Sequence, residues 1–166
     1  MKSSNLSLFV FLIQFACLMA SCSEKRIVYK DKFYNSKFSS TSATSRRLPL
    51  LKPYELEENI GWWLSFVNEE NGYAIADKLY VNSQRGFITG YGKLGDITVG
   101  GRSFDNISYF VIDVTQKKEF IPHDSTAFFK KLKEEQLPTD SFLNKTEIRR
   151  LFNEFQKTGK LIWYSE

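Results

Sequence analysis

The spacing of apolar residues changes near residue 122, and this change constrains the fold more than any other feature of the chain. Before it, short runs rich in aromatic and β-branched residues are separated by turn-forming residues, a pattern typical of strands. Short connections such as Asn71-Gly72 favour antiparallel pairing. The expected strands cover residues 61–67, 73–81, 86–91, 96–100, 107–115 and 119–122.

Beyond residue 122, apolar residues recur every three or four positions, as they do on the buried side of a helix. The first predicted helix begins at one of residues 124–126 and ends near Gln136. The second begins at Asn144 or Thr146 and ends at Gly159, a residue suited to a C-terminal cap. The apolar residues that share one side of this helix are Ile148, Leu151, Phe152 and Phe155.

Strands followed by helices indicate an α+β fold. We expect a largely antiparallel sheet of five or six strands over about residues 61–121, with residues 161–164 as a candidate last strand. Two C-terminal helices are expected to pack on one face of this sheet. With 166 residues, 42% of them hydrophobic, the chain has the material for one domain with its own core.

Two adjacent tryptophans raise the question of a binding surface. Neighbouring strand residues point to opposite faces, so a sheet covered on one side can bury only one of Trp62 and Trp63. Trp163 and Tyr164 raise the same question near the C-terminus. We treat these four residues as candidates for partner binding, with structural burial as the alternative.

The positive charge of the chain is concentrated in its N-terminal part. Residues 23–47 hold seven basic and two acidic side chains, whereas residues 48–166 hold 15 basic and 17 acidic ones. A domain that binds DNA or RNA needs positive charge on its folded part. We therefore expect no nucleic-acid partner.

Residues 1–21 have the layout of a secretory signal peptide. Lys2 provides a positive start, an apolar run extends from Leu6 to Ala20, and the run ends in small residues. This run is shorter than the about 20 apolar residues that a membrane-spanning helix needs. An uncleaved membrane anchor is the alternative.

The residues that close the signal peptide resemble the lipobox of bacterial lipoproteins. Met19 takes the leucine-like position, Ala20 and Ser21 take the small positions, and Cys22 takes the position to which diacylglycerol is attached before cleavage. The resemblance implies that Cys22 is the lipid attachment site and the first residue of the mature protein. Several acyl chains, palmitate among them, form an effectively stable membrane anchor.

The same resemblance bears on location and on the second cysteine. Ser23 stands where aspartate retains many lipoproteins at the inner membrane, so an outer-membrane location facing the periplasm is preferred. A disulfide between Cys17 and Cys22 is the alternative in an oxidising compartment. Cleavage before Cys22 removes Cys17 and leaves no partner for such a bond.

Residues 22–53 are expected to form the lipidated cysteine and a flexible basic tether. The serine-rich residues 39–45 cannot bury enough apolar surface to offset the entropy lost on ordering. We interpret the segment as a solvated spacer between the membrane and a globular domain at residues 54–166. Contact of its basic residues with lipid headgroups is the alternative.

Gly90, Gly92 and Gly95 spell the pattern G-x-G-x-x-G. A dinucleotide-binding loop of this kind follows a strand and opens a helix, but the strand-like residues 96–100 follow it here. In a glycine-rich hairpin the pattern more often reflects turns and bulges. We therefore assign no cofactor to it.

His123 is the only histidine, and Asp124 and Ser125 follow it directly. Adjacent residues rarely face one another as a base and a nucleophile must, and one histidine with scattered carboxylates makes a poor zinc site. No catalytic or metal-binding residue is therefore assigned. The other acids considered, none of which is forced into a pair by its spacing, are Asp96, Asp105 and Asp113.

We expect a membrane-anchored envelope lipoprotein whose small domain binds a protein partner. An immunity or inhibitor-type protein and an accessory subunit of an envelope complex are two versions of this hypothesis. The alternative is an envelope hydrolase that acts on glycan or peptidoglycan with acids from several strands. The lack of a catalytic constellation favours a protein that is not an enzyme.

Overall fold

The computed structural model describes residues 26–35, 46–58, 61–68, 72–93, 98–99, 102–103 and 107–164. Cys22, the signal peptide and the serine-rich residues 39–45 lie outside these ranges, so the expectations about them stay predictions. The described part has an α+β fold with two antiparallel sheets, of four and five strands, and two α-helices.

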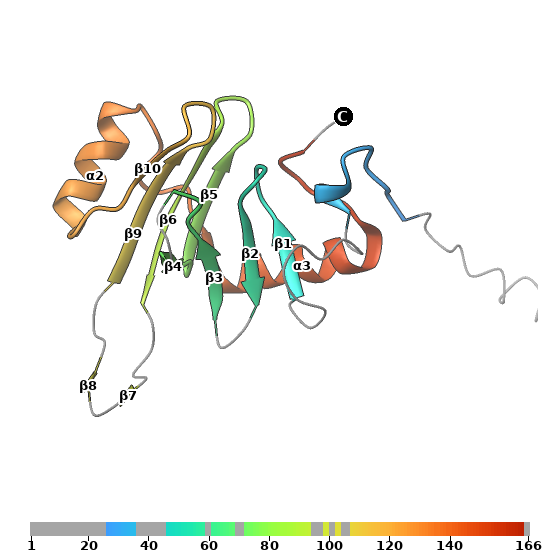
Figure 1. Ribbon diagram of the computed structural model, residues 1–166, viewed down its shortest axis with the longest axis horizontal. Coiled ribbons are helices and arrows are strands. Elements are labelled where there is room, and N and C mark those ends of the chain that lie inside the picture. The colour runs from blue at the N-terminus through green and yellow to red at the C-terminus, as the bar shows by residue number, and fades with distance from the viewer. Residues whose placement is uncertain are drawn as a thin grey trace, which may run out of the picture.

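Strands β1 to β4 form the smaller sheet in chain order (Figure 1). Their bounds are Arg46–Pro49, Glu55–Glu58, Trp62–Ser65 and Tyr73–Ile75. The antiparallel register aligns Leu48, Leu56 and Leu64 across the first three strands. All three leucines are fully buried, so this face of the sheet is part of the core.

The larger sheet has the strand order β10-β9-β6-β5-β11. Its strands in chain order are β5 (Lys78–Asn82), β6 (Phe87–Lys93), β9 (Ile107–Asp113), β10 (Lys118–Phe120) and β11 (Leu143–Asn144). Two further short strands, β7 (Thr98–Val99) and β8 (Arg102–Ser103), pair with each other. A Cβ atom at Gly90 would collide with the carbonyl oxygen of Lys78 and lie 2.6 Å from the Phe110 ring. This glycine of the G-x-G-x-x-G pattern therefore permits close packing in the sheet.

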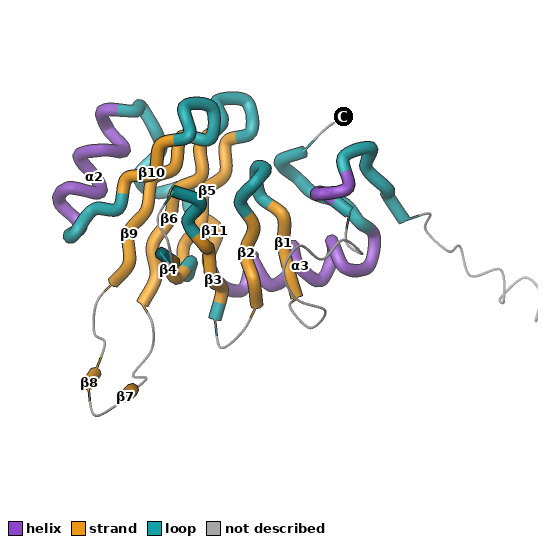
Figure 2. The backbone as a smooth tube through the Cα atoms, viewed as in Figure 1, coloured by secondary structure: helices purple, strands orange, loops and turns teal. Residues whose placement is uncertain are grey.

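The two helices lie on opposite sides of the larger sheet (Figures 1 and 2). They are α2 (Ser125–Glu134) and α3 (Lys145–Thr158). Val111 of β9 packs in a cluster with Phe128 and Leu132 of α2, whereas Phe110 and Ile112 belong to the larger core that contains α3. Because consecutive strand residues point to opposite faces, the expectation that both helices pack on one face is wrong.

The expected strand at residues 73–81 is divided between the two sheets. The Ala76 amide donates to the Trp62 carbonyl at 2.9 Å, and the next amide, that of Asp77, donates to the Tyr91 carbonyl at 3.0 Å. The chain thus leaves β4 and enters β5 within two residues. Only the charged pair Asp77-Lys78 interrupts the strand-like residues 73–81. The sequence pattern does not mark this pair as a break, so it predicts one sheet where the structure has two.

Residues 161–164 form a turn, so the predicted last strand is wrong. The Leu161 amide donates to the Tyr29 hydroxyl at 2.9 Å, and the Trp163 indole donates to the Pro49 carbonyl at 3.0 Å. These bonds tie the C-terminus to the N-terminal segment and to β1. The edge strand beside β5 is β11 instead.

Part of the expected tether is folded. Tyr29, Phe33 and Tyr34 are at most 8% exposed and belong to the larger core. The last two lie in a short 3₁₀ helix, η1 (Lys32–Tyr34). The large aromatic side chains bury enough area to hold this segment on the domain. The folded part therefore includes residues 26–35 and 46–53, and does not begin at residue 54.

Both helix starts agree with the sequence prediction. The Asp124 carboxylate accepts a hydrogen bond from the Ala127 amide at 2.8 Å and caps α2. Asn144 and Glu147 form a capping box at the start of α3. The C-terminal cap of α3 is Gly159 with φ of 77°, a conformation that suits glycine.

Candidate functional site

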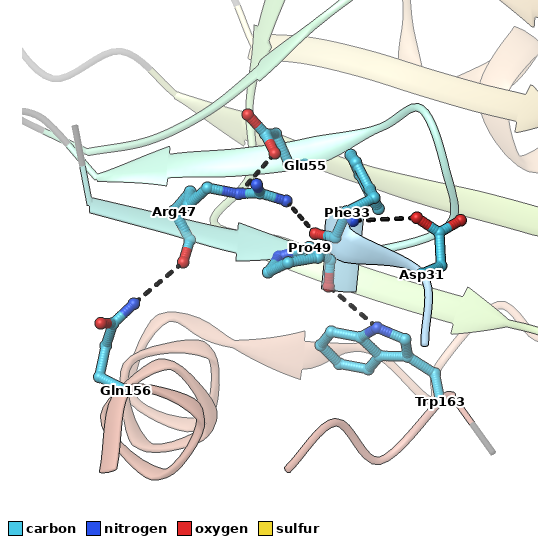
Figure 3. A network of polar contacts seen from close by, with 7 residues as sticks. All are labelled: Asp31, Phe33, Arg47, Pro49, Glu55, Gln156 and Trp163. Atoms are coloured by element: carbon cyan, nitrogen blue, oxygen red, sulfur yellow. Dashed lines mark hydrogen bonds and ion pairs between the residues drawn. The ribbon is translucent and has the colours of Figure 1, made fainter. Parts of the chain in front are cut away.

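Three of the four candidate aromatic residues pack within the domain. Trp62 is 3% exposed and its ring packs on α3. Trp163 is 6% exposed, and Figure 3 shows its indole N–H donating to the Pro49 carbonyl. Tyr164 is half-buried and stacks on Tyr34 with ring centroids 3.8 Å apart. These three residues contact other residues of the same domain.

Trp63 lies on the other face of β3 and is half-buried. Its ring centroid is 4.6 Å from that of Tyr73 in β4, and Tyr73 is 54% exposed. The Trp63 indole N–H is buried and has no hydrogen-bond partner among the residues that the structure describes. An unsatisfied buried donor costs roughly 1–3 kcal/mol.

Tyr73 also borders an open depression with a volume of about 580 Å³. The depression lies between β4, the start of β9 and the segment that leads from β10 into α2. It is lined by Tyr73, Ile107, Ser108, Tyr109, Ile121, Pro122, His123, Asp124 and Ser125. We define the aromatic face as Trp63 together with the apolar residues of this lining: Tyr73, Ile107, Tyr109, Ile121 and Pro122.

Sequence reasoning did not assign the β9 residues to a binding surface. Ile107 and Tyr109 alternate along the strand, which places them on one face. The ring of Tyr109 lies 5.2 Å from that of Phe128 in α2, whereas Ile107 lies one residue pair earlier and is 42% exposed. The alternation of side chains along β9 shows that both residues share one face of the strand. How much of that face α2 covers depends on where the helix begins.

The polar residues at the rim of the depression include Asp124 and His123. The Asp124 carboxylate accepts a hydrogen bond from the Ala127 amide and caps the N-terminus of α2. His123 is exposed and precedes this cap. A triad needs a third group that orients the histidine, and Asp124 is already engaged elsewhere.

A second cavity, of about 300 Å³, brings together carboxylates from three elements. Glu119 of β10 accepts hydrogen bonds from the Tyr54 hydroxyl at 2.6 Å and the Val67 amide at 2.7 Å. Glu135, at the end of α2, pairs with Lys131 at 2.7 Å. We call this cavity, with its carboxylates Asp113, Glu119 and Glu135, the acidic cleft. The hydrolase hypothesis requires a pair of catalytic acids in such a place.

The third carboxylate of the acidic cleft belongs to Asp113. Burial acts to raise its pKa, but hydrogen bonds from the Thr115 hydroxyl at 2.6 Å and the Gln116 amide at 2.9 Å outweigh burial and lower it. A general acid of a glycosidase needs the opposite shift. All three carboxylates therefore have structural partners, and Asp113 is shifted away from acid catalysis.

A polar network joins residues 26–35 to the smaller sheet and α3 (Figure 3). Arg47 is 4% exposed, forms an ion pair with Glu55 at 2.6 Å and donates to the Phe33 carbonyl. The Gln156 amide donates to the Arg47 carbonyl at 3.3 Å. Burial lowers the pKa of Arg47, but an arginine keeps its charge in such surroundings. The network positions the N-terminal segment.

The described part of the chain shows neither a cluster of metal ligands nor a membrane-spanning helix. No group of three His, Cys, Asp or Glu residues in the described part could hold a metal ion. Likewise, none of the helices among the described residues has the length and apolar character needed to cross a bilayer.

Comparison with known proteins finds no matching family model, no matching curated protein and no matching solved structure. The candidate site therefore rests on the geometry and chemistry of this chain alone.

Proposed function

We propose that this protein is an envelope lipoprotein whose α+β domain binds a protein partner through the aromatic face. The observation that carries the proposal is the continuity of the half-buried Trp63 and the exposed Tyr73 with the open depression. Tryptophan and tyrosine are enriched at the centres of protein interfaces. Tyr73 and Ile107 are exposed on this face, and exposed apolar side chains that gather on a small domain are typical of an interaction site.

The lipobox resemblance at residues 19–22 supports attachment through lipid on Cys22. By the same resemblance we propose the outer membrane, with the domain facing the periplasm. An anchored domain of this size suits an immunity or inhibitor-type protein, or an accessory subunit of an envelope complex. We propose binding in preference to hydrolysis because the carboxylates of the acidic cleft already have partners within the chain.

Site-specific photocrosslinking in cells tests the aromatic face. A benzophenone amino acid at position 73 is expected to give one discrete adduct with a partner protein. Position 120, where Phe120 is 40% exposed on β10, is a matched aromatic control and is expected to give none. Adding Trp63→Ala to the position-73 variant should remove the adduct while circular dichroism shows a folded domain. Equal adducts at both positions, or an adduct indifferent to Trp63, would contradict the proposal.

Metabolic labelling tests the anchor separately. Cells that express the full chain are grown with labelled palmitate, and the protein is expected to carry the label. Cys22→Ala should abolish it, while Cys17→Ala should leave it intact. Label retained by the Cys22→Ala protein would rule out Cys22 as the lipid attachment site.

A further inference from the structure

The first described residues are held against the C-terminal end of α3. The Ile27 amide donates to the Thr158 carbonyl at 2.6 Å, and the Arg26 guanidinium donates to the Gln156 carbonyl. A Cβ atom at Gly159 would collide with the Ile27 carbonyl oxygen, so the two segments lie in direct contact. Residues 26 and 27 therefore belong to the folded body.

This contact sets a limit on the distance between the domain and the lipid anchor. Only residues 23–25 separate Cys22 from Arg26. An extended chain covers at most about 3.6 Å per residue, so Arg26 lies within about 14 Å of the anchoring residue. A spacer that ran to residue 53 would allow a much larger distance. The inference that follows rests on the proposed lipid attachment at Cys22.

The surface next to this short connection combines apolar and basic side chains. Val28 is 74% exposed and Ile27 is 42% exposed. Lys157 and Lys160 are exposed at the end of α3 and just beyond it. We define the basal tip as these four residues. Two carboxylates of the described part lie close by in the chain and are paired, Asp31 with Lys52 and Glu154 with Arg150.

We propose that the basal tip docks on the anionic headgroups of the leaflet that holds the lipid anchor, with Val28 at the level of the interface. Exposed apolar residues flanked by lysines have the composition of an interfacial membrane contact. Residues 26–35 lie at one end of the long axis of the molecule, and α2 lies at the other end (Figure 1). Docking at the basal tip thus turns the α2 end away from the membrane, toward a partner in solution.

Spin labels on the lipidated mature protein in vesicles test this orientation. Mature Val28→Cys and Lys130→Cys proteins each offer one free thiol, because Cys22 is held in a thioether and Cys17 is removed with the signal peptide. Lys130 is exposed on α2 and serves as the matched control. The vesicles contain phosphatidylethanolamine and phosphatidylglycerol, and the readout is collision of each label with a water-soluble nickel complex.

We expect the label at position 28 to collide with the nickel complex several-fold less often than the label at position 130. Changing Lys157 and Lys160 to Gln, or replacing phosphatidylglycerol with phosphatidylcholine, should reduce this protection. Equal collision rates at positions 28 and 130 on protein that floats with the vesicles would overturn the docking and leave the anchor intact. Protein that fails to float with vesicles would instead overturn the lipid anchor itself.

Discussion

Trp163 and Trp63 occupy opposite kinds of surroundings in one small domain. Trp163 is 6% exposed, and its indole N–H has a carbonyl partner at 3.0 Å. Trp63 is half-buried beside an exposed tyrosine, and its indole N–H has no partner among the described residues. Trp163 completes the contact between the chain ends and β1. Part of the Trp63 ring remains exposed to solvent, and its N–H donor is unsatisfied. For this reason Trp163 is a packing residue, whereas Trp63 is a candidate binding residue.

The largest expected effect in this comparison comes from Trp163→Ala. Removing a buried indole should lower the free energy of unfolding by about 3–5 kcal/mol, because a large cavity remains between the C-terminal turn and β1. Urea denaturation measures the loss. The exposed neighbour provides the control, since Ile162→Ala should stay within about 0.5 kcal/mol of the wild type. A Trp163→Ala loss as small as that of the control would show that the chain ends are not joined in solution.

Arg47→Met tests the polar part of the same packed region. The substitution leaves the Glu55 carboxylate without its ion pair at a side-chain exposure of 12%, and should cost about 3 kcal/mol of unfolding free energy. Trypsin should also cut faster after Lys30 and Lys32, because the bond from Arg47 to the Phe33 carbonyl is lost.

The double variant Arg47→Met/Glu55→Leu is the control for that prediction. It removes both charges, and should recover most of the lost stability. Unchanged trypsin cleavage in Arg47→Met would mean that aromatic burial alone holds residues 26–35 on the domain.

Tyr73→Ala tests the aromatic face, where binding should change and stability should not. The side chain is 54% exposed, so the free energy of unfolding should stay within about 0.5 kcal/mol. Affinity for the crosslinked partner should fall by about 2 kcal/mol, a factor of roughly 30. Titration calorimetry with the purified partner measures the affinity, and urea denaturation measures the free energy of unfolding. Phe120→Ala is the control and should bind normally. Equal losses for the two variants would remove Tyr73 from the interface.

The smallest expected effect comes from replacing each tryptophan with phenylalanine, which removes the indole N–H and keeps an aromatic ring. Trp63→Phe should lower the free energy of unfolding by no more than about 0.5 kcal/mol, because losing an unsatisfied buried donor offsets the smaller buried ring. Trp163→Phe should cost about 1 kcal/mol more than that, because it abandons the Pro49 carbonyl. Equal costs in thermal or urea unfolding would show that the Trp63 donor finds a partner in solution.

The elements that could be predicted from sequence are those with local causes. Asp124, Asn144 and Gly159 each act within a few residues of their own position, and the structure places all three at the expected helix ends. The break at Ala76 and Asp77 could not be predicted, because it depends on acceptors at Trp62 and Tyr91, far away along the chain. For the candidate site, alternation correctly separated the two faces at Trp62 and Trp63 but did not identify which face would be covered.

By itself, the sequence determined the α+β class and the two helices with their caps, and it predicts the lipid attachment at Cys22 through the lipobox resemblance. These features depend on residue spacing and on contacts within a helical turn, which a linear pattern contains. Tertiary structure alone decided that residues 26–35 pack on the domain, that the strands divide into two sheets, and that Tyr73 meets Ile107 and Pro122 at one depression. Each of these outcomes depends on which apolar residues, far apart in the sequence, bury their surface against one another. A local sequence pattern does not contain that information.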